Sequence, residues 1–94
     1  MDPATKTNIR ARLRRIEGQT KGIARMVEED RYCIDVLLQL QAAQSAMTQV
    51  ARIVFESHMH SCVRAALESD DADEAHEKVD EVLDMFARYS QLLR

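Results

Sequence analysis

Three side chains have the types and the spacing needed to bind a soft metal ion. His58 and Cys62 are four residues apart, so on a helix both lie on one face, one turn apart. An imidazole nitrogen and a thiolate in this arrangement supply half of such a site. Cys33, the only other thiol, would complete a set of two sulfurs and one nitrogen. Because structural zinc sites use four ligands, three ligands of this kind favour Cu(I).

Cys33 cannot reach the other two ligands along one unbroken helix. Residues 32–67 contain no Gly and no Pro, which predicts a single long helix. At about 1.5 Å of rise per residue, the step from Cys33 to His58 spans roughly 38 Å. We therefore expect two antiparallel chains, in which Cys33 of one meets His58 and Cys62 of the other. Two-fold symmetry would give two identical sites per dimer.

Other interpretations of these residues remain open. Cys33 alone could be a small core residue, and His58 a structural histidine. A Cys–His nucleophile needs an orienting group and an oxyanion site, which the sequence does not offer, so we expect no enzyme. A Cu(I) store or chaperone would share the ligands without binding DNA. A persulfide- or formaldehyde-type sensor would use Cys33 and Cys62 as reactive thiols.

The composition predicts one all-α domain spanning residues 1–94. Two Gly and one Pro leave little for turns, and an aromatic content of 4% implies an aliphatic core. Two Cys are too few for a disulfide framework, and no apolar run approaches the ~20 residues that span a bilayer. We expect a cytoplasmic protein with no membrane partner and no organic substrate.

Apolar residues recur at steps of three and four through Ile9–Val27, the pattern of a helix buried along one stripe. We expect Thr5 or Thr7 to cap this helix after a frayed start. Gly18 and Gly22 lie inside it, where each costs about 1 kcal/mol relative to Ala. Close approach of another helix would explain them, and a soft region that bends during switching is the alternative.

Two further helices follow. Residues 28–31 predict a turn in which Asp30 caps a second helix at about 32–67. An acidic break at 68–73 separates it from a third helix that runs to about Leu93. The candidate caps of that helix are Ser69, Asp70, Asp71 and Asp73.

Charge is divided unevenly along the chain. Residues 1–25 carry a net charge of +5 and the remainder −8. A charged helix face is often only a solvated face, but a basic row on an acidic protein is typical of phosphate binding. No helix-turn-helix or zinc-finger motif accompanies it, so a standard means of reading base edges is absent from the sequence.

Four stretches resemble the CsoR/RcnR family of metal-sensing repressors. They are Arg12–Gln19 (RLRRIEGQ), Tyr32-Cys33, residues 39–46 (QLQAAQSA) and His58-x-x-x-Cys62. Cys33, His58 and Cys62 match the ligand pattern of the copper-sensing branch, CsoR. The nickel/cobalt branch has an N-terminal histidine and a histidine where Cys62 stands. The formaldehyde-sensing branch lacks the third thiol, and the persulfide-sensing branch lacks the histidine.

The resemblance implies an all-helical dimer that pairs into a tetramer. The metal-free form would bind operator DNA and repress copper-resistance genes, and Cu(I) bound between subunits would weaken DNA binding. Tyr32 and Glu81 would link the ligated histidine to the third helix. The implied DNA-binding residues are Arg12 and Arg52, to which we add Arg14, Arg15 and Lys21.

Overall fold

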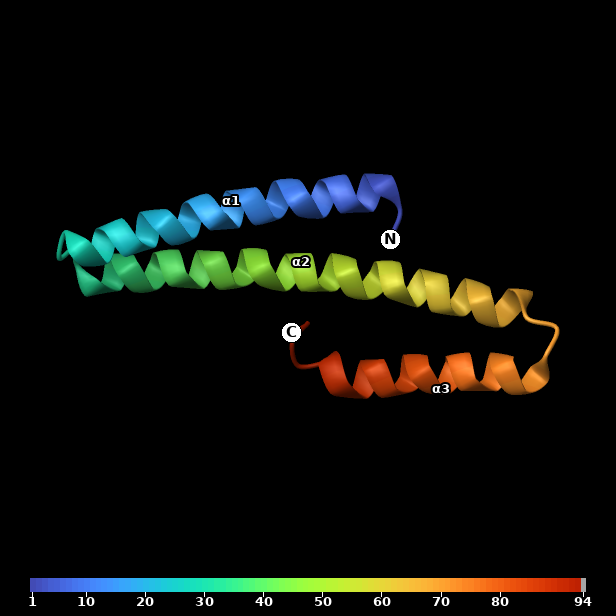
Figure 1. Ribbon diagram of the computed structural model, residues 1–94. Helices are drawn as coiled ribbons and strands as arrows, with labels where there is room; N and C mark the ends of the chain where they lie inside the picture. The colour runs from blue at the N-terminus through green and yellow to red at the C-terminus, as the bar shows by residue number, and fades with distance from the viewer. Residues whose placement is uncertain (94) are drawn as a thin grey trace.

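The computed structural model describes residues 1–93, which form three helices and no strand. They are α1 (Pro3–Glu28), α2 (Cys33–Glu68) and α3 (Ala72–Tyr89). Figure 1 shows α1 lying antiparallel along α2 from its N-terminal end to beyond its midpoint, and α3 returning along its C-terminal half. The predicted all-α fold with one long central helix is confirmed.

The first helix begins earlier than predicted. Asp2 is extended, with φ −72° and ψ 159°, and α1 starts at Pro3. The fixed φ of proline suits the first position of a helix, where its missing N–H is not needed. The predicted capping by Thr5 or Thr7 is therefore wrong, because both residues lie within the helix.

The turn between α1 and α2 also differs in detail. Asp30 has a positive φ of 53°, a left-handed conformation that Asp tolerates in tight turns. Tyr32, and not Asp30 as predicted, is the residue that precedes the first turn of α2. The helix then continues for 36 residues without interruption, so Cys33 and His58 do lie on one rod.

The start of α3 matches one of the predicted caps. The backbone N–H of Asp73 donates to Oδ1 of Asp71 at 2.9 Å, which satisfies a donor that the first turn leaves free. The helix ends at Tyr89, short of the predicted Leu93. Acidic residues in the first turn and Arg88 in the last suit the helix dipole.

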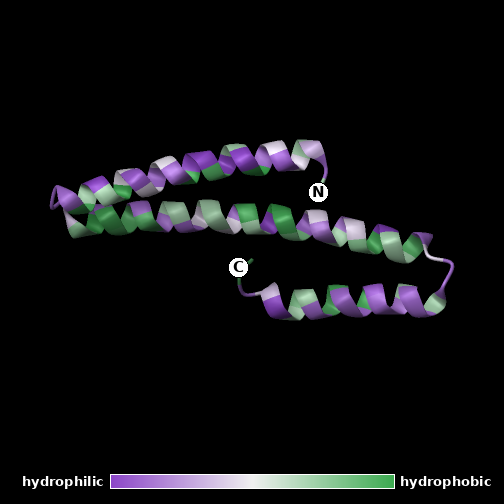
Figure 2. Ribbon diagram, viewed as in Figure 1, coloured by the Kyte–Doolittle hydropathy of each residue, from purple (hydrophilic) through white to green (hydrophobic). Residues whose placement is uncertain are grey.

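A single chain buries little of its apolar surface. Ile9, Ile16 and Val50 form the main buried cluster between α1 and α2, whereas Figure 2 shows hydrophobic residues along much of α2. A Cβ added at Gly18 or Gly22 would meet nothing within 4 Å. The predicted close approach at these glycines is therefore not made within this chain.

The molecule is elongated. Its extents are 61 × 27 × 13 Å and its radius of gyration is 18.3 Å, whereas a compact chain of this length has about 12 Å. Across residues 1–93, each helix is too short or too polar to span a bilayer.

Candidate metal centre

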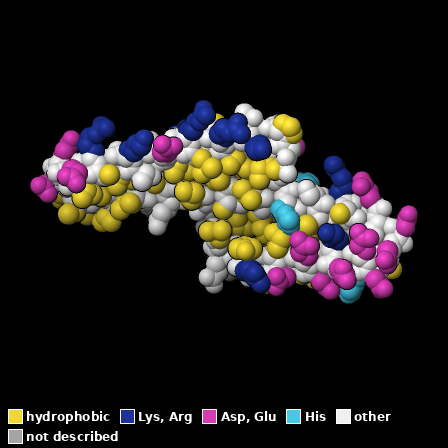
Figure 3. Space-filling model, in the orientation of Figure 1, with side chains coloured by type: hydrophobic (Ala, Val, Ile, Leu, Met, Phe, Trp, Pro, Cys, Tyr) yellow, Lys and Arg dark blue, Asp and Glu magenta, His cyan; other side chains and the backbone are white. Residues whose placement is uncertain are grey.

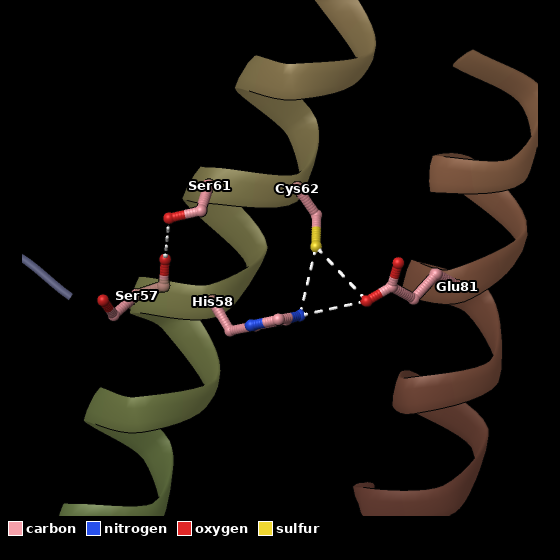
Figure 4. Close-up of polar contacts among 5 residues, drawn as sticks. All are labelled: Ser57, His58, Ser61, Cys62 and Glu81. Atoms are coloured by element: carbon pink, nitrogen blue, oxygen red, sulfur yellow. Dashed lines mark hydrogen bonds and ion pairs between the residues drawn. The ribbon is translucent and has the colours of Figure 1, made fainter. Parts of the chain in front are cut away.

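Three potential ligand atoms converge where α3 packs against α2. Nε2 of His58 lies 3.1 Å from Sγ of Cys62 and 3.3 Å from Oε1 of Glu81. Sγ of Cys62 lies 3.9 Å from the same Oε1. His58 and Cys62 extend from consecutive turns of α2, and Glu81 reaches across from α3 (Figure 4). The sequence spacing correctly predicted that His58 and Cys62 share a face.

These side chains differ in exposure and protonation. Cys62 is buried, whereas the side chains of His58 and Glu81 are 44% and 46% exposed. Burial raises the pKa of the Cys62 thiol, the negative charge of Glu81 raises it further, and the positive charge of Lys78 opposes this. The net effect favours the protonated thiol, whose S–H can donate toward Glu81.

Aromatic packing and the Asp71 cap hold α3 in place. The ring of Phe55, buried on α2, lies 6.5 Å from that of Phe86 on α3, with the planes inclined by 55°. This tilted arrangement is a favourable one for aromatic pairs. Phe55 lies three residues before His58, and Phe86 lies five residues after Glu81, so the contact fixes the two helices close to the ligand atoms.

Cys33 and Tyr32 lie elsewhere. Both are exposed at the start of α2, and Cys33 is a free thiol. Within one chain, Tyr32 and Cys33 therefore do not reach His58 and Cys62, because the length of α2 separates them. The thiolate and imidazole provided by α2 fit Cu(I), while the carboxylate of Glu81 is a harder ligand.

The predicted DNA-binding residues lie mainly on α1. Figure 3 shows Lys and Arg side chains along α1 and an acidic concentration around α3. Arg14 and Arg15 are exposed. Nε of Arg12 donates to Oδ1 of Asn8 at 3.1 Å, and Lys21 forms an exposed ion pair with Glu17 at 3.4 Å. Of these α1 residues, Lys21 is thus the one with an acidic partner in the part of the chain that the structure describes.

Arg52 is distant from this row in sequence and lies on α2. Its guanidinium donates to the backbone carbonyl of Leu93 at 2.7 Å. This contact ties the segment after α3 back to the middle of α2.

Most of the chain matches the sequence pattern of one known protein family. The model of the family described as "Metal-sensitive transcriptional repressor" matches residues 5–88. The chain belongs to this family. The resemblance inferred from the sequence motifs is thus confirmed.

Named members of the repressor family share much of the sequence. The copper-sensing transcriptional repressor CsoR of Bacillus subtilis (strain 168) is 46% identical over 86 residues, 92% of this chain and 82% of that protein. The copper-sensing repressor RicR of Mycobacterium tuberculosis (strain ATCC 25618 / H37Rv) is 53% identical over 62 residues, 66% of this chain and 65% of that one.

Solved structures of repressors share the fold. The copper-sensing repressor CsoR with Cu(I) from Geobacillus thermodenitrificans NG80-2 gives a TM-score of 0.78 at 36% identity, covering 96% of this chain and 91% of that chain. The nickel-responsive regulator InrS gives 0.72 at 35% identity, covering 85% and 90%.

One residue near the ligand atoms of this repressor was not predicted. Lys78 precedes Glu81 by three residues on α3, a spacing that puts both on one helix face. It lies close enough to lower the pKa of Cys62. Once Glu81 is assigned to the site, its i,i+3 spacing from Lys78 is the sequence signal that could have predicted Lys78 nearby.

Proposed function

We propose that this repressor responds to Cu(I). The metal-free protein binds operator DNA, and Cu(I) held by His58, Cys62 and the Cys33 of a second chain weakens that binding and derepresses copper-resistance genes. The observation that carries the proposal is the 3.1 Å approach of the His58 nitrogen to the Cys62 sulfur. The copper-sensing relatives support the choice of metal.

A second chain is needed on two independent grounds. The first is the roughly 38 Å of α2 that separate Cys33 from His58. The second is the exposed apolar surface, which includes Leu37, Leu38 and Val63 on α2. An antiparallel partner would cover such surface, as small chains with thin cores require, and would supply Cys33. Dimers would then pair into a tetramer, as the family resemblance implies.

Glu81 provides a path from this site to the rest of the molecule. It extends from α3 and contacts the His58 ring, so any change in the orientation of the ring changes the position that α3 prefers. The contact is to Nε2 of His58, so Glu81 would fix the orientation of the ring when the other nitrogen, Nδ1, holds Cu(I), as carboxylates commonly do for ligating histidines. We assign Tyr32 of the second chain to the same supporting role.

The DNA contact is assigned to the basic residues of α1, with Arg52. Exposed arginines bind phosphate through charge-assisted hydrogen bonds, and neutralising phosphates makes the affinity depend steeply on salt. Linkage requires reciprocity, so DNA must weaken Cu(I) binding by the same factor by which Cu(I) weakens DNA binding.

A thiol-sensing repressor is the second candidate, because both cysteines are free. It would use Cys33 and Cys62 in covalent chemistry with a persulfide or an aldehyde. The His58 imidazole beside Cys62 and the presence of both thiols weigh against it, because the persulfide-sensing branch lacks the histidine and the formaldehyde-sensing branch lacks one of the two thiols. A Cu(I) store is the third, and it would bind no operator.

Operator binding with and without Cu(I) tests the proposal. Operator DNA would be selected from a random-sequence pool by the metal-free protein, and its affinity measured by fluorescence anisotropy without metal and with one Cu(I) per chain. We expect binding by the metal-free protein and release by Cu(I). Cys33→Ala and His58→Ala should bind the DNA but fail to release it.

His60→Ala is the matched control. His60 is exposed, two residues from His58, and lies off the face shared by His58 and Cys62, so this variant should release DNA like the wild type. Release of the His58→Ala variant by Cu(I) would contradict the proposed ligand set. Release by a persulfide donor and not by Cu(I) would favour the thiol sensor, and failure to select any DNA would favour the store.

A further inference from the structure

We infer that His58, Cys62 and Glu81 of one chain form a binding site for a borderline divalent cation such as Zn²⁺ or Co²⁺, with the Glu81 carboxylate as a direct ligand. The site shares two residues with the proposed copper site, but it needs no second chain and replaces the sulfur of Cys33 with an oxygen.

The distances among the three atoms carry this inference. Their separations are 3.1, 3.3 and 3.9 Å. Ligands at 2.0–2.3 Å from a tetrahedral Zn²⁺ lie about 3.4–3.6 Å apart, so each observed separation is within about 0.5 Å of that value. A point about 2 Å from all three atoms therefore exists near their plane, and little movement is needed to admit an ion.

The nitrogen of His58 that makes the contact decides whether Glu81 can act as a metal ligand or only as a residue that supports the histidine. The same Nε2 faces both the Cys62 sulfur and the Glu81 oxygen. A nitrogen that binds a cation has no proton to donate to Glu81, so the carboxylate cannot support the ring through Nε2 at that time. When a cation is bound to Nε2, the Glu81 oxygen is placed to coordinate the same ion.

The chemistry of the donors selects the class of ion. One thiolate and one carboxylate together neutralise a divalent cation, and nitrogen, sulfur and oxygen together form a borderline donor set. Cu(I) gains little from a carboxylate, whereas Zn²⁺ accepts Cys, His and Glu alike. The half-exposed side chains of His58 and Glu81 leave a path for the ion and room for water as a fourth ligand.

Co²⁺ is the probe, because its visible spectrum reports both thiolate coordination and ligand number. Metal-free protein would be titrated anaerobically with Co²⁺, and Zn²⁺ then added as a competitor. We expect a thiolate-to-cobalt charge-transfer band that Zn²⁺ abolishes, since Zn²⁺ binds such donors more tightly. Cys33→Ala should keep this band, because the site lies within one chain.

Glu81→Gln should change the ligand-field bands and weaken Co²⁺ binding by more than about 100-fold, beyond the 10–100-fold typical of losing a residue that only supports a ligand. Glu77→Gln is the matched control. Glu77 lies one turn earlier on α3, outside the triad, and its loss should change neither the spectrum nor the affinity.

Two results would overturn the inference. One is an unchanged Co²⁺ spectrum in Glu81→Gln, and the other is loss of the charge-transfer band in Cys33→Ala. A parallel Cu(I) titration separates this inference from the proposed function. Glu81→Gln should still bind Cu(I). If Cu(I) releases the DNA but Co²⁺ binding does not depend on Glu81, only the present inference is contradicted. If Co²⁺ binding depends on Glu81 but Cu(I) does not release the DNA, only the proposed function is contradicted.

Discussion

The Cys62 thiol shows how much of a site local spacing determines. That His58 and Cys62 meet follows from their i,i+4 spacing on a helix, so it could be predicted from the residues alone. The approach of Glu81 depends on the register of α3 against α2 after an acidic loop, which no local pattern fixes, and Glu81 was assigned only from the family resemblance. The raised pKa of Cys62 comes first from burial and then from the charge of Glu81 on α3.

The charges on α3 predict opposite shifts in the pKa of Cys62. In a Cys33→Ala background, where Cys62 is the only thiol, Glu81→Gln removes a negative charge and should lower its pKa. Lys78→Met removes a positive charge and should raise it. The pH dependence of alkylation by iodoacetamide, followed by mass spectrometry, measures both. Shifts in the same direction for the two variants would contradict the assigned contacts.

The same pKa has a consequence for folding. The folded chain holds the Cys62 proton more tightly than the unfolded chain does, because burial raises its pKa. This contribution to stability is complete at pH values below the ordinary pKa of a thiol, and it is lost as the pH rises through the raised pKa.

The helices themselves were more predictable than their ends. Apolar periodicity predicted α1, and the absence of Gly and Pro predicted the unbroken α2, since both signals extend over many residues. The ends depend on one or two residues each. Pro3 starts α1 where Thr5 or Thr7 was expected, and Asp30 lies in a left-handed turn and does not cap α2. At the start of α3 four candidates were equally plausible, and Asp71 is the residue that caps it.

Loss of the α3 cap should destabilise the protein. Asp71→Ala removes the acceptor for the Asp73 N–H and should lower the free energy of unfolding by about 1 kcal/mol. Asp71→Asn should restore most of it, and Asp70→Ala, next to the cap, should change little. Urea unfolding at one fixed protein concentration measures these differences, and equal losses for Asp70→Ala and Asp71→Ala would show that this cap does not contribute.

The basic face of α1 predicts a defined electrostatic effect. Arg14→Ala and Arg15→Ala should each weaken operator binding similarly across DNA sequences, and each should reduce the slope of log affinity against log salt by about 1. Arg88→Ala is the control, because Arg88 pairs with Asp84 on the acidic helix α3. An Arg88→Ala effect as large as that of Arg14→Ala would argue against α1 as the DNA-binding face.

At the scale of the whole molecule, a single chain is elongated and leaves much apolar surface exposed. Its radius of gyration of 18.3 Å exceeds that of a compact chain, and Tyr32 and Leu67, near the two ends of α2, are 69% and 81% exposed. The sequence predicted the elongated shape, because an unbroken 36-residue helix cannot return on itself. How two chains would pack could not be predicted from residue spacing alone, because several exposed apolar stripes of α2 could form the contact.

The central claim is that two chains complete one Cu(I) site, and mixed dimers test it directly. One chain would carry Cys33→Ala, and the other both His58→Ala and Cys62→Ala. The two would be given different affinity tags and purified together. Cu(I) binding would then be measured against a competing chelator. Each variant alone should bind Cu(I) weakly, whereas the mixed dimer should bind one Cu(I) tightly, since one intact ligand set is restored. Tight binding by Cys33→Ala alone, or no recovery in the mixed dimer, would contradict the account.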